Sequence, residues 1–316
     1  MKFLGSKALF LLTTLVLSSF LFSTATASAA DVKKPAFDLK ARTVKLNNGV
    51  DMPIIGLGTF TLPDREAEFA TYTALKAGFR LIDTARAYRN EAAVGRGLKR
   101  AIDEGIVKRE DVFITTKLWP GDYANAERAL DESLKSMGLD YLDLILLHQP
   151  DRRNGGDVVA YKAMEKAVKD GKVRAIGLSN IYTPQDFDRV AKAVSIPPAI
   201  LQNETHPFYQ SKEMKPYIEE NYGTTLMCWY PLGGRGNTQK LFENETIKKI
   251  AKAHDVSSAQ VILRWHVQSG QIAIPGASNE DYIKEDYDLW DFELSDAEMA
   301  EMKALDKDEP FFRFRF

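Results

Sequence analysis

The sequence contains one cysteine in 316 residues and no dense run of basic residues. Cys228 therefore has no partner for an intramolecular disulfide, and the fold must depend on its hydrophobic core. The formal net charge is −2, from 42 Lys and Arg against 44 Asp and Glu. Such a balance offers no basic surface to a phosphate backbone, so nucleic-acid binding is not expected.

Histidine and glycine-rich motifs are also scarce. The chain has four histidines, none of which pairs with another at the spacing of a helical metal site, so a metal centre is not expected. No G-x-G-x-x-G follows an apolar run. Gly56-Leu-Gly58 and Gly95-Arg-Gly97 are too short to indicate a Rossmann dinucleotide site.

The first thirty residues differ from the rest of the chain. Lys2 and Lys7 flank the start of an apolar run over 8–22, which is followed by small residues over 23–30. This layout predicts a secretory signal peptide, cleaved after Ala29 or Ala30. A retained membrane anchor is the alternative, but the run is short for a span. No arginine pair precedes the run, and no cysteine lies at the cleavage point, so a Sec-type leader is expected rather than a Tat leader or a lipoprotein anchor.

We therefore expect an exported, periplasmic protein whose mature chain, residues 31–316, has no membrane segment. Nothing in the mature chain resembles a linker, a low-complexity segment or a coiled coil, so a single domain and a monomer are expected.

From residue 40 onward, short apolar runs alternate with longer amphipathic stretches about every thirty residues. The runs are largely apolar and do not alternate, as in parallel strands that are buried on both faces. The expected strands are 54–57, 80–82, 112–116, 142–147, 173–177, 200–202, 224–229 and 272–274. The expected helices are 66–77, 92–104, 124–137, 158–169, 185–193, 212–221, 245–254 and 257–268. Eight such βα units in about 270 residues favour an α/β fold of the closed (β/α)8 TIM-barrel type over an open sheet.

Four ionisable residues follow or end these strands. Asp83 ends the second strand, Tyr88 begins the next loop, and Lys117 and His148 come directly after the third and fourth strands. Singly, each has an ordinary explanation: a turn cap, a core aromatic, a surface lysine or an interior histidine. In a barrel, however, the carboxyl ends of the strands share one mouth, so we expect these side chains to meet.

Together the four groups can transfer a proton. An ammonium beside a phenol stabilises phenolate and lowers its pKa from about 10, while a carboxylate holds the lysine in place. A neutral histidine can donate to a carbonyl oxygen. The set is therefore suited to polarising a carbonyl group and protonating the alkoxide that forms when hydride reaches the carbon.

A hydride requires a cofactor, and polar groups at later strand ends could bind one. Ser179, Asn180 and Gln202 can hydrogen-bond a carboxamide, and the indole of Trp229 can stack on a nicotinamide ring. The glycines of Pro231-Leu-Gly-Gly234 let backbone N–H groups approach a pyrophosphate. The alternative is that 229–234 is a simple turn at the end of a strand.

From about residue 43 to residue 306 the chain resembles the aldo-keto reductases, and it is similar to the bacterial branch that contains 2,5-diketo-gluconate reductases. The motifs that match in order and spacing are Gly56-Leu-Gly-Thr59, Leu81-Ile-Asp-Thr-Ala85, Tyr88-Arg-Asn-Glu91, Thr116-Lys117, Leu147-His148, Gly177-Leu-Ser-Asn180, Gln202, Glu204-Thr-His-Pro207, Pro231-Leu-Gly233 and Ile274-Pro275.

The resemblance implies an NADPH-dependent (β/α)8 enzyme that reduces small aldehydes, ketoaldehydes or keto-sugars. It makes Tyr88 the general acid, tuned by Lys117 and Asp83, and makes His148 the residue that orients the carbonyl. It implies cofactor contacts by Thr59, Asp83, Ser179, Asn180, Gln202, Trp229, Pro231, Leu232, Gly233, Gly276, Ala277, Ser278, Asn279 and Tyr282. It implies substrate contacts by Phe60, Trp119, His148 and Gln149.

Three departures from the family pattern bear on specificity. Gly276-Ala277 and Tyr282 stand where the family usually has Lys-Ser and an arginine that clamp the 2′-phosphate of NADPH, so NADH or dual use is open. Gln149 replaces a common tryptophan, which predicts a more polar pocket. The tail, residues 308–316, is short and gives no indication of the substrate.

A second hypothesis comes from another functional class: an exported sensor or interaction subunit that binds the cofactor with little turnover. The predicted export signal motivates it, because reduced nicotinamide is not expected to be abundant outside the cytoplasm.

Overall fold

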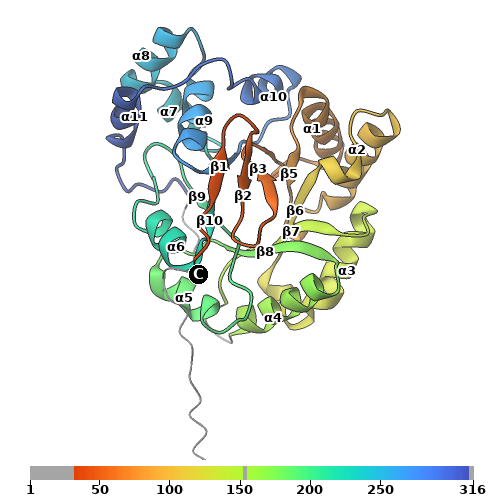
Figure 1. Cartoon of the computed structure of the whole chain (residues 1–316). Helices are drawn as coiled ribbons and strands as arrows, with labels where there is room; N and C mark the ends of the chain where they lie inside the picture. Colours follow the sequence, from red (N-terminus) through yellow and green to blue (C-terminus); the bar gives the residue numbers. More distant parts are fainter. Residues whose placement is uncertain (1–31, 152–154, 313–316) are drawn as a thin grey trace, which may run out of the picture. The chain divides into compact units, whose positions relative to one another are not determined.

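The computed structural model describes residues 32–151 and 155–312, so the predicted signal peptide over 1–30 lies outside the described residues. In this part of the chain eight parallel strands follow one another in chain order and form a closed barrel (Figure 1). The strands are β4 (Leu57–Gly58), β5 (Leu81–Asp83), β6 (Phe113–Leu118), β7 (Leu142–Leu147), β8 (Val173–Ser179), β9 (Ile200–Glu204), β10 (Thr225–Trp229) and β11 (Ile272–Ile274).

Backbone hydrogen bonds join the last strand, β11, to the residues that lead into the first strand, β4. The Gly56 N–H donates to the Ala273 oxygen at 2.9 Å, and the Ala273 N–H donates to the Ile54 oxygen at 3.1 Å. The predicted closed (β/α)8 barrel is therefore confirmed. Its strands β6 and β7 are buried at every position, which is the pattern of a sheet covered on both faces.

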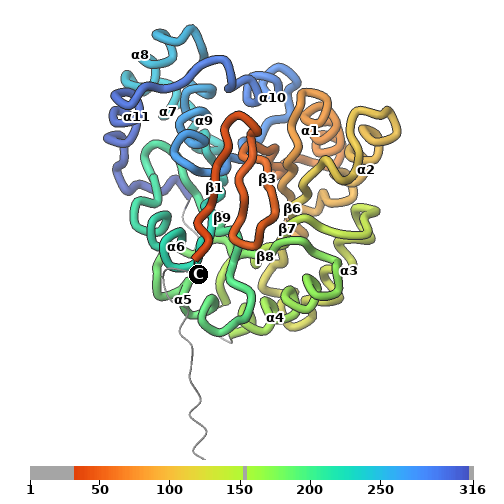
Figure 2. Tube along the Cα trace, in the orientation of Figure 1, coloured from red at the N-terminus to blue at the C-terminus, as the bar shows by residue number. Residues whose placement is uncertain are grey.

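Helices surround the barrel (Figure 2). They are α1 (Asp64–Ala77), α2 (Glu91–Asp103), α3 (Ala126–Met137), α4 (Gly156–Lys169), α5 (Pro184–Ala191), α6 (Met214–Tyr222), α7 (Thr238–Phe242), α8 (Glu245–His254), α9 (Ser258–Gln268), α10 (Glu280–Tyr287) and α11 (Asp296–Lys303). Short 3-10 helices cover Arg86–Tyr88, Arg109–Asp111 and Pro120–Asn125. Thr183 begins α5 by accepting the Asp186 N–H, and Gly138 ends α3 with a φ of 68°, as the cap residues indicate.

Three antiparallel strands before the barrel were not predicted: β1 (Ala36–Asp38), β2 (Thr43–Lys45) and β3 (Asp51–Pro53). Each has three residues, which is too short for an alternating pattern to be recognised. Val44 and Met52 of this N-terminal sheet are fully buried, in one cluster with the barrel residues Leu81 and Phe113. Because Leu81 and Phe113 begin β5 and β6, the N-terminal sheet closes the end of the barrel where the strands start (Figure 1).

The helices α7, α10 and α11 were not predicted either, because they are short and bury few apolar side chains. Capping residues in the sequence could have predicted the starts of two of these helices, α10 and α11. Asn279 accepts the first N–H groups of α10, and Ser295 with Glu298 forms a capping box at the start of α11. None of the described helices is both long enough and apolar enough to cross a bilayer.

Candidate active site

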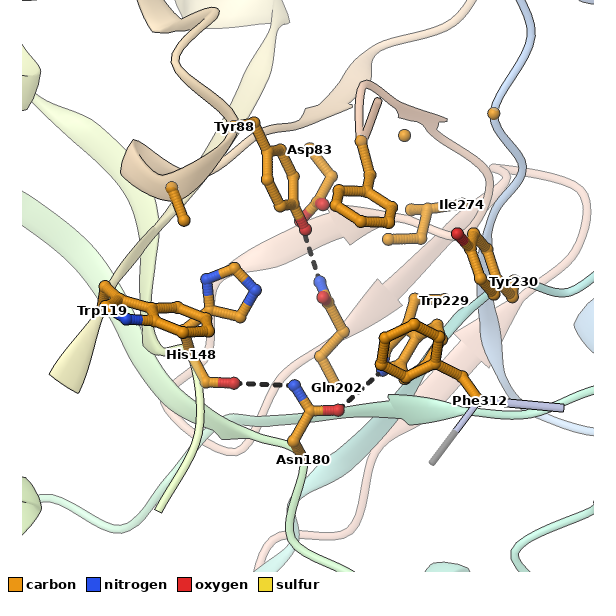
Figure 3. Close-up of a pocket in the computed structure, with 14 residues that line it drawn as sticks. Asp83, Tyr88, Trp119, His148, Asn180, Gln202, Trp229, Tyr230, Ile274 and Phe312 are labelled. Carbon is orange, nitrogen blue, oxygen red and sulfur yellow. Dashed lines mark hydrogen bonds between the residues drawn. The ribbon is translucent and has the colours of Figure 1, made fainter. Parts of the chain in front are cut away.

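A cavity of about 400 Å³ lies at the mouth of the barrel, where the strands end (Figure 3). Asp83, Trp229 and Ile274 are the last residues of their strands, and His148 and Asn180 directly follow β7 and β8. The structure therefore brings together residues that lie far apart in the sequence. The cavity is lined by Gly58, Phe60, Asp83, Ala87, Tyr88, Trp119, His148, Asn180, Gln202, Trp229, Tyr230, Ile274, Gly276 and Phe312.

Lys117 connects Asp83 to Tyr88. Its Nζ atom donates to Asp83 Oδ1 at 2.5 Å, to the Thr84 carbonyl oxygen at 3.0 Å and to the Tyr88 hydroxyl oxygen at 3.2 Å. Lys117 lies within β6 and is fully buried, not directly after the strand as predicted, because β6 continues to Leu118. The other Asp83 oxygen accepts from Gln202 Nε2 at 2.8 Å. A carboxylate, an ammonium and a phenol thus form one hydrogen-bonded chain.

Burial raises the pKa of Asp83 and lowers the pKa of Lys117, because each charge is removed from water. Their mutual attraction at 2.5 Å opposes both shifts, so we describe the pair as an ion pair. The ion pair keeps a positive charge next to the phenol in a site that excludes most water.

The pKa of Tyr88 is raised well above its ordinary value, first by burial and then by the negative charge of Asp83. The sequence had predicted a lowered value. The ammonium is at hydrogen-bonding distance as expected, but in the resting protein desolvation of the phenolate outweighs it. Tyr88 therefore carries its proton in the resting state, as a proton donor must.

His148 faces the same cavity. Its ring meets the rings of Tyr88 and Trp119 edge-on, with centroid distances of 5.5 and 5.0 Å. Its Nδ1 atom is buried and has no hydrogen-bond partner among the described residues. Burial, with a smaller contribution from the charge of Lys117, lowers the pKa of His148 to about 3. The imidazole is therefore neutral and can act as a hydrogen-bond donor through one nitrogen.

We expect the ring signals of His148 in an NMR titration to stay unchanged from pH 8 to pH 5, because the folded pKa is about 3. The unfolded side chain titrates near pH 6.5, so the folded state loses stability as pH falls from there toward 3. A His148→Asn variant assigns the signals. A His148 midpoint near pH 6.5 would contradict the burial argument.

The three polar side chains predicted to hold a carboxamide, Ser179, Asn180 and Gln202, are placed differently from one another. Gln202 lines the cavity, and both hydrogen bonds of its side chain within the described residues are donated by Nε2, so its Oε1 atom is left open. Asn180 also lines the cavity, but it donates to the His148 carbonyl oxygen and accepts from Trp229 Nε1 at 3.1 Å (Figure 3). Ser179 is buried and donates to the Gln202 carbonyl oxygen, outside the cavity lining.

Aromatic rings form much of the cavity wall. Phe60 lies 4.9 Å from the Tyr88 ring and 6.1 Å from the Tyr230 ring, and Trp119 stands on the other side of His148. Gln149, predicted to contact substrate, does not line the cavity; its backbone oxygen accepts from the Tyr123 hydroxyl instead. The wall is therefore aromatic, and the more polar pocket expected from Gln149 is not what the structure shows.

A second cavity, of about 590 Å³, shares Phe60, Tyr230 and Gly276 with the first, so the two adjoin; together they are called the elongated site below. Of the predicted cofactor contacts, those that line it are Pro231, Leu232, Gly276, Ala277, Ser278, Asn279 and Tyr282. Thr59 and Gly233 do not. Thr59 is fully buried and donates to the Asp83 carbonyl oxygen, and Gly233 forms a turn with a φ of 84°.

Four of the lining residues that the sequence did not indicate bear on the chemistry of the site: Arg235, Tyr230, Phe312 and Asp286. Arg235 is the one basic residue in the described lining of the second cavity, and its place after Gly233-Gly234 could have indicated an anion contact. Tyr230 and Phe312 line the first cavity. Asp286 lines the second, and burial raises its pKa well above the ordinary value; its position within a short, charged helix gave no signal.

Within the described residues, no three His, Cys, Asp or Glu side chains converge as a metal ion would require. The elongated site instead combines an acid–base chain at one end with a long groove that contains one arginine. That combination fits an organic cofactor beside a proton-transfer centre.

Comparisons with known proteins agree with this description. The model of the aldo/keto reductase family matches residues 54–307. The chain is 42% identical over 280 residues to morphine 6-dehydrogenase of Pseudomonas putida, covering 84% of this chain and 92% of that protein. It is 43% identical over 270 residues to glyoxal reductase of Bacillus subtilis (84% and 94%). The crystal structure of a Bombyx mori aldo-keto reductase in complex with NADP superposes with a TM-score of 0.80 at 32% identity, covering 86% of this chain and 94% of that one.

Proposed function

Since this chain belongs to the aldo/keto reductase family, we propose that it reduces small aldehydes, ketoaldehydes or keto-sugars to alcohols, with Tyr88 as the proton donor. The observation that carries the proposal is the hydrogen-bonded chain from Asp83 through Lys117 to the Tyr88 hydroxyl, which opens on a cavity beside His148. When bound, a reduced nicotinamide would supply the hydride.

The residues of the chain divide the proton chemistry among them. A carbonyl oxygen that lies between Tyr88 and His148 can accept from both, which polarises the carbonyl group. As negative charge develops on that oxygen, Tyr88 gives up its proton, and the Lys117 ammonium stabilises the phenolate. Asp83 keeps Lys117 charged and oriented. The aromatic wall around the cavity excludes water, which strengthens each of these interactions.

Several residues fit a nicotinamide cofactor in the elongated site. The open Oε1 atom of Gln202 can accept from a carboxamide NH₂ group, and Trp229 presents an indole at the same cavity. Arg235 would face the pyrophosphate along the groove. Asn180 orients Trp229 through the indole N–H, so we assign it a positioning role in addition to the carboxamide contact expected from the resemblance.

The direct test is oxidation of NADH and NADPH by the purified protein in the presence of methylglyoxal, a panel of aldehydes and several keto-sugars. Turnover supports the reductase. Cofactor binding without turnover across the panel would support the sensor hypothesis instead. The names of the relatives, a dehydrogenase and a reductase, favour the enzyme.

We propose that NADH is used at least as well as NADPH. Gly276, Ala277 and Tyr282 stand where the family usually clamps the 2′-phosphate, and Arg235, which we assign to the pyrophosphate, is the one Lys or Arg in the described lining of the groove, which also carries the acidic side chain of Glu285. Tyr282 is 63% exposed, so Tyr282→Arg should be tolerated. We expect this variant to tighten NADPH binding about 10-fold relative to NADH, in line with a charge-assisted hydrogen bond of about 1.5 kcal/mol. Quenching of tryptophan fluorescence measures both affinities, with Tyr282→Gln as the uncharged control.

A wild-type protein that binds NADPH far more tightly than NADH would contradict this assignment. So would a Tyr282→Arg variant whose ratio of affinities equals that of Tyr282→Gln.

We also propose that the protein is exported to the periplasm as a monomer after removal of residues 1–30. The support is the layout of the first thirty residues. Cell fractionation with mass spectrometry of the purified product tests it, and a full-length cytosolic product would overturn it. Size-exclusion chromatography with light scattering tests the oligomeric state.

A further inference from the structure

We propose that Glu204 is a positioning residue that anchors the C-terminal segment, residues 306–312, at the active-site cavity, and that it thereby sets the preference of the enzyme for bulky aromatic carbonyls over small ones. The inference rests on the proposed carbonyl reductase function. Glu204 does not line the cavity itself, so it acts through the segment that it holds.

Glu204 is the last residue of β9 and is fully buried. Its carboxylate accepts two successive backbone N–H groups of the C-terminal segment. Oε1 accepts from Phe311 at 2.7 Å and from Phe312 at 3.1 Å, and Oε2 lies 3.2 Å from the Phe312 nitrogen. Hydrogen bonds to a charged acceptor are roughly twice as strong as neutral ones. The backbone of the C-terminal segment is therefore held by a side chain that lies 107 residues earlier in the sequence than Phe311.

The two N–H groups of the C-terminal segment also stabilise the buried Glu204 carboxylate. No Lys or Arg in the described chain forms an ion pair with Glu204; the one ionisable side chain in contact is His206, whose Nε2 atom lies 3.3 Å from Oε1. A buried carboxylate without hydrogen bonds is strongly disfavoured. Most of the compensation therefore comes from the two N–H groups of the C-terminal segment, so removing either side destabilises the docked arrangement.

Further contacts define where the docked segment places its side chains. The N–H groups of Lys307 and Glu309 donate to the Phe208 oxygen at 3.0 and 3.2 Å. The Phe311 ring stacks on the His206 ring at a centroid distance of 4.1 Å. Phe312 then meets Trp229 edge-on at 5.8 Å and lines the cavity (Figure 3).

The consequence for substrates follows from size. A three-carbon carbonyl compound such as methylglyoxal needs Tyr88 and His148 and covers little of the wall. An aromatic aldehyde buries its ring against the aromatic side chains, and Phe312 is one of them. Releasing the segment should therefore reduce activity with the aromatic substrate more than with the small one.

Glu204→Leu tests the anchor, because leucine has a similar volume and suits a buried site but cannot accept a hydrogen bond. Amide hydrogen exchange of the C-terminal peptide should become faster than in the wild type. The ratio of kcat/KM for benzaldehyde to kcat/KM for methylglyoxal should fall about 10-fold, mainly through KM. Glu204→Gln keeps the Oε1 acceptor of both N–H groups. Its exchange rate and its ratio of kcat/KM values should therefore lie between those of the wild type and those of Glu204→Leu.

The chain offers a matched control in Glu165, a buried glutamate that accepts the N–H groups of Ser195 and Ile196 at 2.6 and 2.5 Å. Glu165→Leu removes the same kind of contact away from the cavity. It should lower stability without changing the substrate ratio. An equal change of the ratio in both variants would overturn the proposal.

Deleting residues 308–316 keeps Glu204 and removes the segment that it holds, so it tests the same link even if Glu204→Leu does not fold. We expect the ratio of kcat/KM for benzaldehyde to kcat/KM for methylglyoxal to fall as much as in Glu204→Leu. It should not fall further when Glu204→Gln is added to the deletion. An unchanged ratio in the deletion variant, or additive losses in the combined variant, would overturn the positioning role. The hydrogen exchange does not depend on turnover. Equal exchange in the wild type and Glu204→Leu would therefore refute the anchor even if the proposed reductase function failed.

Discussion

Replacing Tyr88 with phenylalanine is expected to lower kcat for every aldehyde substrate by roughly 10²- to 10⁴-fold, the range ascribed to a positioned general acid. The variant loses the hydroxyl that Lys117 contacts at 3.2 Å but keeps the ring that packs against Phe60 at 4.9 Å. The proton that the alkoxide requires would then have to come from water, which the aromatic wall keeps out. Steady-state oxidation of NADH or NADPH measures the loss.

Two controls separate chemistry from folding in this experiment. The thermal midpoint of Tyr88→Phe should stay close to that of the wild type, because the ring and its packing remain. Cofactor affinity, measured by tryptophan fluorescence, should change by less than about 3-fold, since Tyr88 is assigned to the carbonyl and not to the cofactor. A variant with wild-type turnover would sink the assignment of Tyr88 as the proton donor.

Replacing Lys117 with methionine is expected to lower the free energy of unfolding by about 3–5 kcal/mol, because the Asp83 carboxylate is left buried without its cation. Both side chains are almost completely buried, at 1% and 3% exposure. The double variant Asp83→Asn with Lys117→Met should recover much of that loss, since no uncompensated charge remains. Its kcat should nevertheless stay low, because no ammonium stabilises the phenolate. Urea denaturation and steady-state kinetics measure the two quantities on the same samples.

The Lys172–Asp131 pair provides the exposed counterpart, with an N–O distance of 2.6 Å and side-chain exposures of 41% and 54%. Lys172→Met should cost no more than about 1 kcal/mol, as is usual for ion pairs in contact with water. If Lys117→Met and Lys172→Met cost the same, burial is not what makes the Asp83–Lys117 pair important. If the double variant regains wild-type kcat, the lysine has no role in proton transfer.

The sequence was sufficient for the barrel because its strands are largely apolar and do not alternate, and a run such as Leu144-Ile-Leu-Leu147 can be identified without tertiary information. The shared mouth followed from the barrel, so Asp83 and His148 could be placed at strand ends. Lys117 was harder. A lysine is rarely found within a buried strand, so β6 was expected to end before Lys117. The strand continues to Leu118 because Asp83 on the neighbouring strand accepts a hydrogen bond from the Lys117 ammonium.

Features that depend on contacts distant in the sequence could not be predicted. The direction of the Tyr88 pKa shift depends on how much water the surrounding rings exclude, and no local pattern encodes this. Phe312 lines the cavity at the end of a segment whose backbone donates to Glu204, a contact 108 residues away in the sequence. Gln149 was expected to contact substrate because it follows His148, but its position after the strand does not determine where the chain turns next.

The N-terminal sheet has a consequence for synthesis of the protein on the ribosome. Its residues Val44 and Met52 are buried in one cluster with Ile200 and Ile272, so the surface that buries them is not complete until the last barrel strand has been made. The N-terminal sheet is thus synthesised early but buried late. Its apolar side chains stay exposed to other molecules while some 220 further residues, from Met52 to Ile272, are synthesised. Contacts of such large sequence separation slow folding. A growing chain that stops before Ile272 would therefore present these side chains to chaperones and proteases, whereas the finished barrel hides them.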